Sequence, residues 1–524
     1  MRMPAESGRG ARSHAGLALA SAALLAAVAV VVLVLASGRS GPARVRPGGA
    51  RDAVSADGAG HSADTAVEVV QTTSDLSDRL TRLRALALTT SAARGAFVIR
   101  IDDAVRYQRV TGVGAAMTDT SAWLLADELP AAARAAVMAD LFGPDGIHLR
   151  VLRLPIGASD FTHDRMPYSY DDLAPGQSDP TLAHFSVAHD DAYIIPMLRQ
   201  ALSLDPGLEI LASPWSPPAW MKTNASLANF EDRGGLRPGD YGAWARYLAA
   251  FLQAYARRHV RIAAITPQNE PGEESRYPGL DLTVGEEDLL IARYLVPALA
   301  ADDLHPAVYA LDATWRRRRR AEVIVGDRAV VRHVAGLAWH CYSGNPSAMS
   351  ALHRLSPRLA EIVSECSTGI APGPSAELVI AAMRNWASTV ILWNLALDPA
   401  GGPVQPPNHG CPHCTGIVSV DERTHTVSDT ADYYELGQFG EFVQPGARRI
   451  ASNDFVTDTY ADRKLGVGYT TPGLDDVAFA NPDGTYVLLV HNSASHAIRF
   501  AVSWRGRSFT HALPAGATVT FMWR

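Results

Sequence analysis

The stretch "AAITPQNEPG", residues 263–272, is an apolar run that ends abruptly at an amide and a carboxylate, Asn269 and Glu270. A short apolar run of this kind is consistent with a buried strand. In barrels of parallel strands, the side chains that carry function lie where the strands end, at the carboxyl face. The stretch therefore predicts a buried strand that presents Asn269 and Glu270 at a functional face.

Seven more apolar runs of this kind recur along the chain, and segments with helical spacing separate them. These segments include residues 121–142 and 241–258, where apolar side chains recur three and four positions apart. Together with residues 262–270 there are eight runs, which predicts an α/β fold with a closed (β/α)8 TIM barrel at residues 107–445. The other seven runs cover residues 109–117, 148–157, 208–215, 307–312, 334–342, 360–366 and 389–394.

After residue 445 the helical spacing gives way to two-residue alternation, as in "TYVLLVHN" (485–492) and "ATVTFMW" (517–523). This pattern is typical of strands with one buried face. Residues 446–524 are therefore predicted to form an all-β sandwich domain. Residues 76–106, which include the strand-like "AFVIRID", are expected to add amino-terminal strands to the same sandwich.

The amino terminus carries an export signal. Residues 15–36 are uncharged and follow a basic segment, residues 1–14. The apolar run is longer than the roughly 7 to 15 residues of a cleavable signal core and close to the ~20 that span a bilayer, which favours a transmembrane anchor over a cleaved signal peptide. We therefore expect an extracytoplasmic protein, anchored in the membrane or secreted, with residues 1–14 on the cytoplasmic side. Residues 37–75 contain few large apolar side chains and are predicted to be a disordered linker.

The composition limits the classes of partner. The 524 residues are 47% hydrophobic, which is enough for a large core and more than one domain. The net charge is −7, and the positive charges are almost all arginine rather than lysine, which indicates coding bias more than a nucleic-acid surface. The dense run Arg316–Arg320 could bind an anionic lipid or polymer, but a solvated loop or helix face is favoured, and the run is given no role. The sequence indicates no oligomeric state.

Four cysteines are present. Cys411 and Cys414, in "GCPHCTG", are close enough for half of a zinc site, but no second close pair completes it. Because export is expected, a local Cys411–Cys414 disulfide is the favoured interpretation. Cys341 and Cys366 lie inside apolar runs and are expected to be buried thiols.

Two glutamates end predicted strands. Glu270 closes the fourth run and Glu365 ends the seventh, in "IVSECSTG". Strands four and seven lie on opposite sides of an eight-stranded barrel, so their ends can converge over its mouth. Acid and base chemistry at a glycosidic bond requires two facing carboxyl groups. Each glutamate alone could be a polar strand terminus, but the pair favours a catalytic site.

Other polar and aromatic side chains fall at the same strand ends. Asn269 could donate to a sugar hydroxyl or cap the following loop. Asp119 could bind a sugar diol or cap a helix. Aromatic side chains offer flat faces for sugar C–H groups, although each could also belong to the core. The aromatic candidates are Trp215, Trp220, Tyr342 and Trp393, and Arg153 and His340 are polar candidates inside strands.

Several sequence blocks together resemble glycoside hydrolase family 30, the family of glucosylceramidase. They run in order from about residue 97 to the carboxyl terminus. They are "GVGAAMTDTSAWLL", "LRLPIGASDFT", "YSYDD", "ASPWSPPAWMKTN", "TPQNEP", "SECSTG" and "LWNLALDPAGGP".

The resemblance implies a (β/α)8 barrel with a β-sandwich built from both ends of the catalytic region. It also implies a retaining hydrolysis in which Glu365 is the nucleophile and Glu270 the general acid and base. No metal or organic cofactor is required. By the same resemblance, Asp119, Trp215, Asn269 and Trp393 line the glycone subsite, Tyr342 lies beside the nucleophile, and Arg153 and His340 support the glutamates.

Two departures from the family affect the leaving-group side. Cys341 stands where the glucosylceramidase has a tryptophan, and residues 403–416 replace its loop after the eighth strand. We therefore expect a β-glucoside or β-glucan substrate, with a glucosylceramidase or β-glucosidase activity favoured. An endo-β-1,6-glucanase or a β-xylosidase of the same family is the alternative. A carbohydrate-binding surface protein without catalysis is the alternative from another class.

Overall fold

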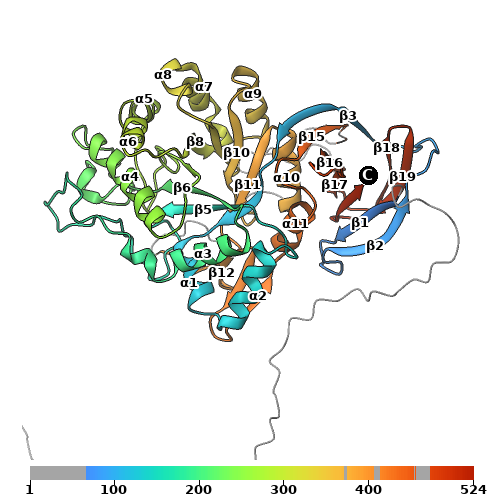
Figure 1. Ribbon diagram of the computed structural model, residues 1–524, viewed down its shortest axis with the longest axis horizontal. Helices are drawn as coiled ribbons and strands as arrows, with labels where there is room; N and C mark the ends of the chain where they lie inside the picture. The colour runs from blue at the N-terminus through green and yellow to red at the C-terminus, as the bar shows by residue number, and fades with distance from the viewer. Residues whose placement is uncertain (1–65, 371–373, 406–412, 454, 456–472) are drawn as a thin grey trace, which may run out of the picture. The chain divides into compact units, whose positions relative to one another are not determined.

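The computed structural model of the chain describes residues 66–370, 374–405, 413–453, 455 and 473–524 (Figure 1). The predicted basic terminus (1–14) and signal segment (15–36) lie outside these residues, so both stay predictions. Across the described ranges, none of the helices combines the length and the apolar character that spanning a bilayer requires.

The folded part begins earlier than the sequence analysis predicts. The disordered linker was predicted to extend to residue 75. This boundary is wrong, because Ala66–Thr72 form strand β1. All three valines of β1 are buried, and its backbone pairs on one side with β2 (Thr81–Ala87) and on the other with β20 (Thr518–Trp523). The strand gains its stability from pairing with the carboxyl terminus, which composition alone does not reveal.

Eight parallel strands close into a barrel, which confirms the predicted fold. The order around the barrel is β10-β11-β4-β5-β6-β7-β8-β9, so the last barrel strand in the chain pairs with the first. Strands β4, β5 and β9 are buried along their whole length, as expected where both faces of a parallel sheet are covered. The barrel strands are β4 (Gly112–Ala116), β5 (Val151–Ile156), β6 (Glu209–Pro214), β7 (Ala264–Ile265), β8 (Ala307–Thr314), β9 (Gly336–His340), β10 (Ala360–Glu365) and β11 (Ala387–Leu392).

Helices alternate with the barrel strands (Figure 1). The segment 241–258 forms a single helix, α4 (Tyr241–Arg257). The segment 121–142 instead forms two, α1 (Asp119–Ala126) and α2 (Ala131–Phe142), because Pro130 lacks the N–H that a continuous helix needs. The remaining helices are α3 (Ile194–Leu204), α5 (Val284–Leu289), α6 (Val296–Ala301), α7 (Arg318–Gly326), α8 (Arg328–Val331), α9 (Ser347–Leu355), α10 (Ser375–Arg384) and α11 (Ala431–Gly440), with a π-helical turn at Leu290–Leu295 and 3₁₀ turns at Ala188–Asp191, Ala219–Met221 and Trp315–Arg317.

A nine-stranded β-sheet joins both ends of the described chain, in the order β19-β18-β3-β15-β16-β17-β20-β1-β2. The predicted extra strand "AFVIRID" belongs to β3 (Val98–Arg109), which pairs with β15 and β18. The other strands of this sheet are β15 (Arg448–Ser452), β16 (Leu474–Ala480), β17 (Tyr486–Asn492), β18 (Ile498–Trp504) and β19 (Arg507–Leu513). A smaller sheet after β11 contains β12 (Ala396–Leu397), β13 (Val418–Asp421) and β14 (Thr426–Asp429).

The arginine run continues from β8 into a 3₁₀ turn and the start of α7. Three of its arginines form ion pairs with acidic side chains: Arg317 with Glu273, Arg318 with Glu322, and Arg320 with Glu287. The run is therefore largely neutralised within the protein, in agreement with a solvated helix face.

Candidate active site

Glu270 lies in the turn that follows β7. Its φ of 43° is in the left-handed region, which is uncommon for residues other than glycine. Two backbone hydrogen bonds hold the turn: the Asn269 N–H donates to the Pro214 carbonyl (2.8 Å) and the Glu270 N–H to the Asp312 carbonyl (2.9 Å). Such strain persists only where the surroundings fix it, and it is common at functional sites. The Tyr277 hydroxyl, which the sequence analysis missed, donates to Glu270 Oε2 at 3.5 Å.

Glu365 is the last residue of β10 and is only 6% exposed. Its Oε2 accepts a hydrogen bond from Arg153 Nη1, and its Oε1 accepts one from the Tyr342 hydroxyl at 2.9 Å. Burial raises the pKa of Glu365, and the Glu270 carboxyl adds to this rise, whereas His340 and Arg153 oppose it. The two donors fix the orientation of the carboxylate before any substrate arrives.

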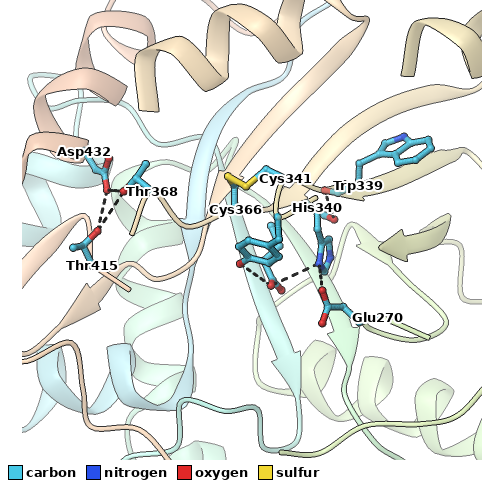
Figure 2. Close-up of a disulfide and its surroundings, with 11 residues drawn as sticks. Glu270, Trp339, His340, Cys341, Cys366, Thr368, Thr415 and Asp432 are labelled. Atoms are coloured by element: carbon cyan, nitrogen blue, oxygen red, sulfur yellow. Dashed lines mark hydrogen bonds and ion pairs between the residues drawn. A yellow bond between two sulfur atoms is a disulfide. The ribbon is translucent and has the colours of Figure 1, made fainter. Parts of the chain in front are cut away.

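The imidazole of His340 lies close to both glutamates, and Figure 2 shows it beside Glu270. Its Nδ1 is 2.9 Å from Glu270 Oε1 and 3.7 Å from Glu365 Oε1, and carboxylate oxygens of the two glutamates lie within 4.8 Å of each other. Burial would lower the pKa of His340, but the carboxylates of Glu365, Asp312 and Glu270 outweigh it and raise the pKa to about 10. The protonated ring donates from both nitrogens, so neither nitrogen has a lone pair for a metal.

Asp312, which the sequence analysis did not single out, is the buried anchor of the site. It lies at a bulge of β8, with a φ of 40°, and its side chain is fully buried. Its Oδ1 accepts from His340 Nε2 (3.0 Å) and Ser364 (2.6 Å), and its Oδ2 accepts from Arg153 (2.9 Å) and two hydroxyl groups. Burial alone would raise the pKa of Asp312, but Arg153 and the donors hold it far below its usual range.

Arg153 connects the two carboxylates to the amide of Asn269. Its guanidinium is fully buried, pairs with Glu365 and Asp312, and donates from Nη2 to Asn269 Oδ1 at 2.7 Å. Burial opposes the charge of Arg153, but Asp312 and Glu365 raise its pKa further above the ordinary value. The amide oxygen of Asn269 is thereby occupied, and its N–H₂ is the part left to donate to a ligand.

Trp215 and Trp393 form the apolar wall of the site. Their rings stack at 5.2 Å with planes 20° apart, and the Arg153 guanidinium lies 4.7 Å from the ring centre of Trp215. Both indoles are at most 3% exposed, so they form a buried wall instead of an exposed rim. Trp220 is not part of this wall, because its indole N–H donates to the Asp171 carbonyl and its ring joins the main core.

Asp119 does not present a free carboxylate to a sugar. Its Oδ1 accepts from the backbone and the ring of His163, both at 2.8 Å. Its Oδ2 accepts from His189 (2.8 Å) and Tyr193 (2.7 Å). Burial would raise the pKa of Asp119, but these donors lower it well below its usual range. A sugar diol would have to displace protein donors from both oxygens, so the arrangement does not favour the predicted role. Nor is Asp119 the helix cap, which is Thr118.

Asp160 is a third carboxyl group near the glutamates, and the sequence analysis missed it. It follows β5, in "GASDFT", and its side chain is 6% exposed. Its backbone carbonyl accepts from the Gln405 N–H at 2.9 Å, and its carboxylate has a backbone hydrogen bond but no donor among the described side chains. Burial and the charges of Glu365 and Glu270 raise the pKa of Asp160 well above its usual range. Its position in a motif just after a strand end was the available signal.

A disulfide joins the strand ends that carry the site (Figure 2). Cys341 and Cys366, predicted to be buried thiols, are instead bonded to each other, with Cα atoms 5.2 Å apart. The prediction was wrong because β9 and β10 are neighbours in the barrel, which places the residues after His340 and Glu365 face to face. The predicted Cys411–Cys414 disulfide involves Cys411, which lies outside the described residues, so it stays a prediction.

Two family models match the chain. The glycosyl hydrolase family 30 TIM-barrel domain matches residues 110–443, and the family's β-sandwich domain matches residues 446–521. An endo-1,6-β-D-glucanase of Neurospora crassa is 31% identical over 423 residues, which cover 79% of this chain and 85% of that protein. The lysosomal acid glucosylceramidase of Mus musculus is 29% identical over 448 residues, which cover 80% and 82%. A solved endo-β1,6-glucanase structure superposes with a TM-score of 0.74 at 27% identity, covering 87% of this chain and 99% of that one.

Proposed function

We propose a specific activity from the premise that this chain belongs to glycosyl hydrolase family 30 and is a glycoside hydrolase. The protein cleaves β-1,6-linked glucan internally and with retention of anomeric configuration. Glu365 is the nucleophile and Glu270 the general acid and base. The observation that carries this proposal is the pair of glutamates at the ends of β7 and β10, held by a shared histidine.

The spacing of the two carboxyl groups supports retention. Retaining glycosidases hold their carboxyl groups about 5–5.5 Å apart, whereas inverting enzymes leave about 6.5–9.5 Å for a water molecule. Oxygens of Glu270 and Glu365 lie within 4.8 Å of each other. This leaves space for the anomeric carbon between them but not for an additional water.

In the first step, Glu365 attacks the anomeric carbon while Glu270 donates its proton to the leaving oxygen. The C–O bond to the leaving group breaks, and a glycosyl ester forms on Glu365. Arg153 and Tyr342 hold the Glu365 carboxylate through separate oxygens, so the attack requires little reorientation.

In the second step, Glu270 removes a proton from water, and the water oxygen displaces Glu365 from the anomeric carbon. The ester carries no charge, so the negative charge facing Glu270 is lower during this step. His340 bonds Glu270 through Nδ1 and Asp312 through Nε2, which keeps the general acid and base in place throughout.

The glycone is bound by Asp160, the Asn269 amide N–H₂ and the wall of Trp215 and Trp393. Asp160 replaces Asp119 in this proposal, because the carboxylate of Asp160 has no side-chain donor in the described protein. A sugar hydroxyl can supply that donor and so relieve the cost of a buried carboxyl group. Tyr342 then limits the space beside Glu365.

Identity to the Neurospora endo-1,6-β-D-glucanase and the likeness to the solved endo-β1,6-glucanase support the glucan substrate. The leaving-group side agrees with it: Cys341, which replaces a tryptophan of the glucosylceramidase, is 3% exposed and bonded to Cys366, so it offers no aromatic face to a lipid. Similarity to the mouse glucosylceramidase extends over the same length and makes cleavage of glucosylceramide the second candidate.

An extracytoplasmic location, through residues 15–36, is part of the proposal. The Cys341–Cys366 disulfide supports it, because such bonds persist in oxidising compartments. The test is to locate the full-length protein by fractionation: recovery with the membrane or the medium supports export, and recovery with soluble cytoplasmic protein contradicts it.

The activity is tested by product analysis. The purified protein is given a linear β-1,6-glucan and, in parallel, glucosylceramide in detergent. We expect oligosaccharides of several lengths from the glucan at early times and no release of ceramide. Glu365→Gln, the control, should abolish the release of oligosaccharides. Glucose and ceramide from the second substrate alone would replace the glucanase with a glucosylceramidase.

A further inference from the structure

The segment between β5 and α3 contains a cluster of two aspartates and a histidine that the proposed reaction does not use. One ligand atom each of Asp171, Asp179 and His184 lies within 4.8 Å of the other two. Asp179 Oδ2 accepts from the His184 backbone N–H (2.7 Å) and lies 2.9 Å from its ring Nδ1. Two carboxylates and an imidazole at these distances are a set of donors suited to a divalent cation.

Asp171 is the unusual member of the cluster. It is 1% exposed, and neither carboxylate oxygen has a hydrogen-bond partner among the described residues. The indole N–H of Trp220 lies nearby and favours the ionised carboxyl, but it is directed at the Asp171 backbone carbonyl, at 3.2 Å. A buried carboxylate without a partner is costly, and proteins compensate such groups by pairing or by metal coordination.

The described protein supplies no direct cationic partner for the Asp171 carboxylate. Among the described residues, no arginine or lysine forms an ion pair with Asp171 or Asp179, and His184 pairs only with Asp179. The exposed ring of His184 leaves a path from solvent to the cluster.

We propose that Asp171, Asp179 and His184 bind one divalent cation of the zinc or manganese class. Zinc bonds to carboxylate oxygen and imidazole nitrogen are about 2.0–2.2 Å long, so adjacent ligand atoms lie about 3 Å apart. The observed 2.9 Å between Asp179 Oδ2 and His184 Nδ1 fits this separation. Asp171 supplies the second negative charge, and water completes the coordination.

The cation would fix the long segment that leads into the active site. This segment also carries Asp160, and its Ala158 N–H donates to the Tyr168 carbonyl at 3.0 Å. The Ser186 N–H donates to the Tyr170 carbonyl at 2.8 Å, one residue before Asp171. The role is structural: the cation holds the segment that positions the glycone subsite, and it takes no part in bond breaking.

The direct test is cation binding to the full-length protein after removal of metals with a chelator. Titration with ZnCl₂ or MnCl₂ in a calorimeter should give one equivalent of bound cation. His184→Ala, which changes an exposed side chain, and Asp171→Asn should each weaken binding at least about tenfold. The matched control is Asp303→Asn, since Asp303 and His305 form an exposed pair at 3.0 Å without a buried carboxylate. Equal binding by all four proteins, or binding by none, would overturn the proposal.

Thermal unfolding gives an independent readout. A cation at about 100 times its Kd should raise the Tm of the unmodified protein by about 3 °C. It should raise the Tm of Asp171→Asn by about half of this amount or less, because that variant is expected to bind the cation at least about tenfold more weakly. Without metal the order should reverse, with Asp171→Asn at least as stable as the unmodified protein, because the substitution removes an unpartnered buried charge. A metal-free Asp171→Asn protein that is clearly less stable would contradict the proposal, as would an equal rise in Tm for both.

Discussion

Asp312 and Asp160 are two buried carboxyl groups near the same pair of glutamates, but their surroundings differ completely. Asp312 accepts hydrogen bonds from Arg153, His340 and three hydroxyl groups, and its pKa is lowered despite burial. Asp160 has no side-chain donor in the described protein, and its pKa is raised. The protein satisfies the first carboxyl itself and leaves the second for a ligand. The difference separates the residue that organises the site from one that binds the substrate.

The largest effect should follow from Asp312→Asn. The amide removes a charge that balances Arg153 and His340, and breaking one partner of a buried pair costs about 3–5 kcal/mol. We expect kcat/KM to fall about 10³-fold and the Tm to fall as well. Steady-state kinetics and thermal unfolding measure the two effects, and a variant with near-normal turnover would show that Asp312 does not organise the site.

The next effect concerns stability at alkaline pH. The pKa of His340 is raised to about 10 in the folded protein, from about 6.5 when unfolded, so the folded state binds this proton more tightly. The resulting stabilisation is fully present below pH ~6.5 and is lost as pH rises towards 10. Denaturant midpoints from pH 6 to 10 should therefore fall more steeply for the unmodified protein than for His340→Gln. Parallel curves would contradict the charged state of His340.

Asp160→Asn should separate binding from stability. Loss of a charged hydrogen bond to the sugar costs about 1.5–3 kcal/mol, so kcat/KM should fall about 10- to 100-fold. The ligand-free protein should become slightly more stable, the opposite of Asp312→Asn, because a buried carboxyl without a side-chain donor disappears. If both substitutions lower the Tm equally, the contrast between the two aspartates is wrong.

A smaller effect is expected when Cys341 and Cys366 are both replaced by alanine. The disulfide closes a loop of 25 residues, and its removal should cost about 3 kcal/mol of stability. The hydrogen bonds that orient Glu365 do not involve either cysteine. Turnover at low temperature should therefore fall by less than about tenfold. A misplaced catalytic group would instead lower turnover by up to about 10²-fold. A larger loss of kcat would show that the disulfide positions the nucleophile.

The smallest effect on activity is expected for Asp119→Asn. Its carboxylate already accepts hydrogen bonds from His163, His189 and Tyr193, so the substitution should reduce the Tm. The value of kcat/KM should change less than about threefold, which corresponds to about 0.6 kcal/mol of transition-state stabilisation. A loss comparable to that of Asp160→Asn would restore Asp119 to the glycone subsite.

The sequence was sufficient to predict the barrel because its signal repeats. Eight apolar runs alternate with helical segments, and both glutamates end such runs. Even β7, which has only two residues in strand geometry, is found from the longer run that contains it. A fold prediction that rests on eight equivalent runs stays correct even when one run is assigned wrongly.

Features that depend on pairing between distant segments were harder to predict. The Cys341–Cys366 bond follows from the register of β9 and β10, and β1 is stable because it pairs with β20. The roles of Asp119 and Asp160 depend on which donors surround each carboxylate, and both residues stand in similar motifs after a strand. The sequence analysis singled out Asp119 and missed Asp160, because the motifs do not reveal which carboxylate the protein's own side chains already satisfy.

The central claim is that Glu365 forms a covalent bond to the sugar. It is tested most directly with an activated 2-deoxy-2-fluoro-β-glucoside, which slows hydrolysis of the glycosyl ester, followed by peptide mass mapping. We predict one fluoroglucosyl group, on the peptide that contains Glu365, and none in Glu365→Gln. A label on any other residue, or turnover of the reagent to the inverted sugar without an ester, would contradict the mechanism.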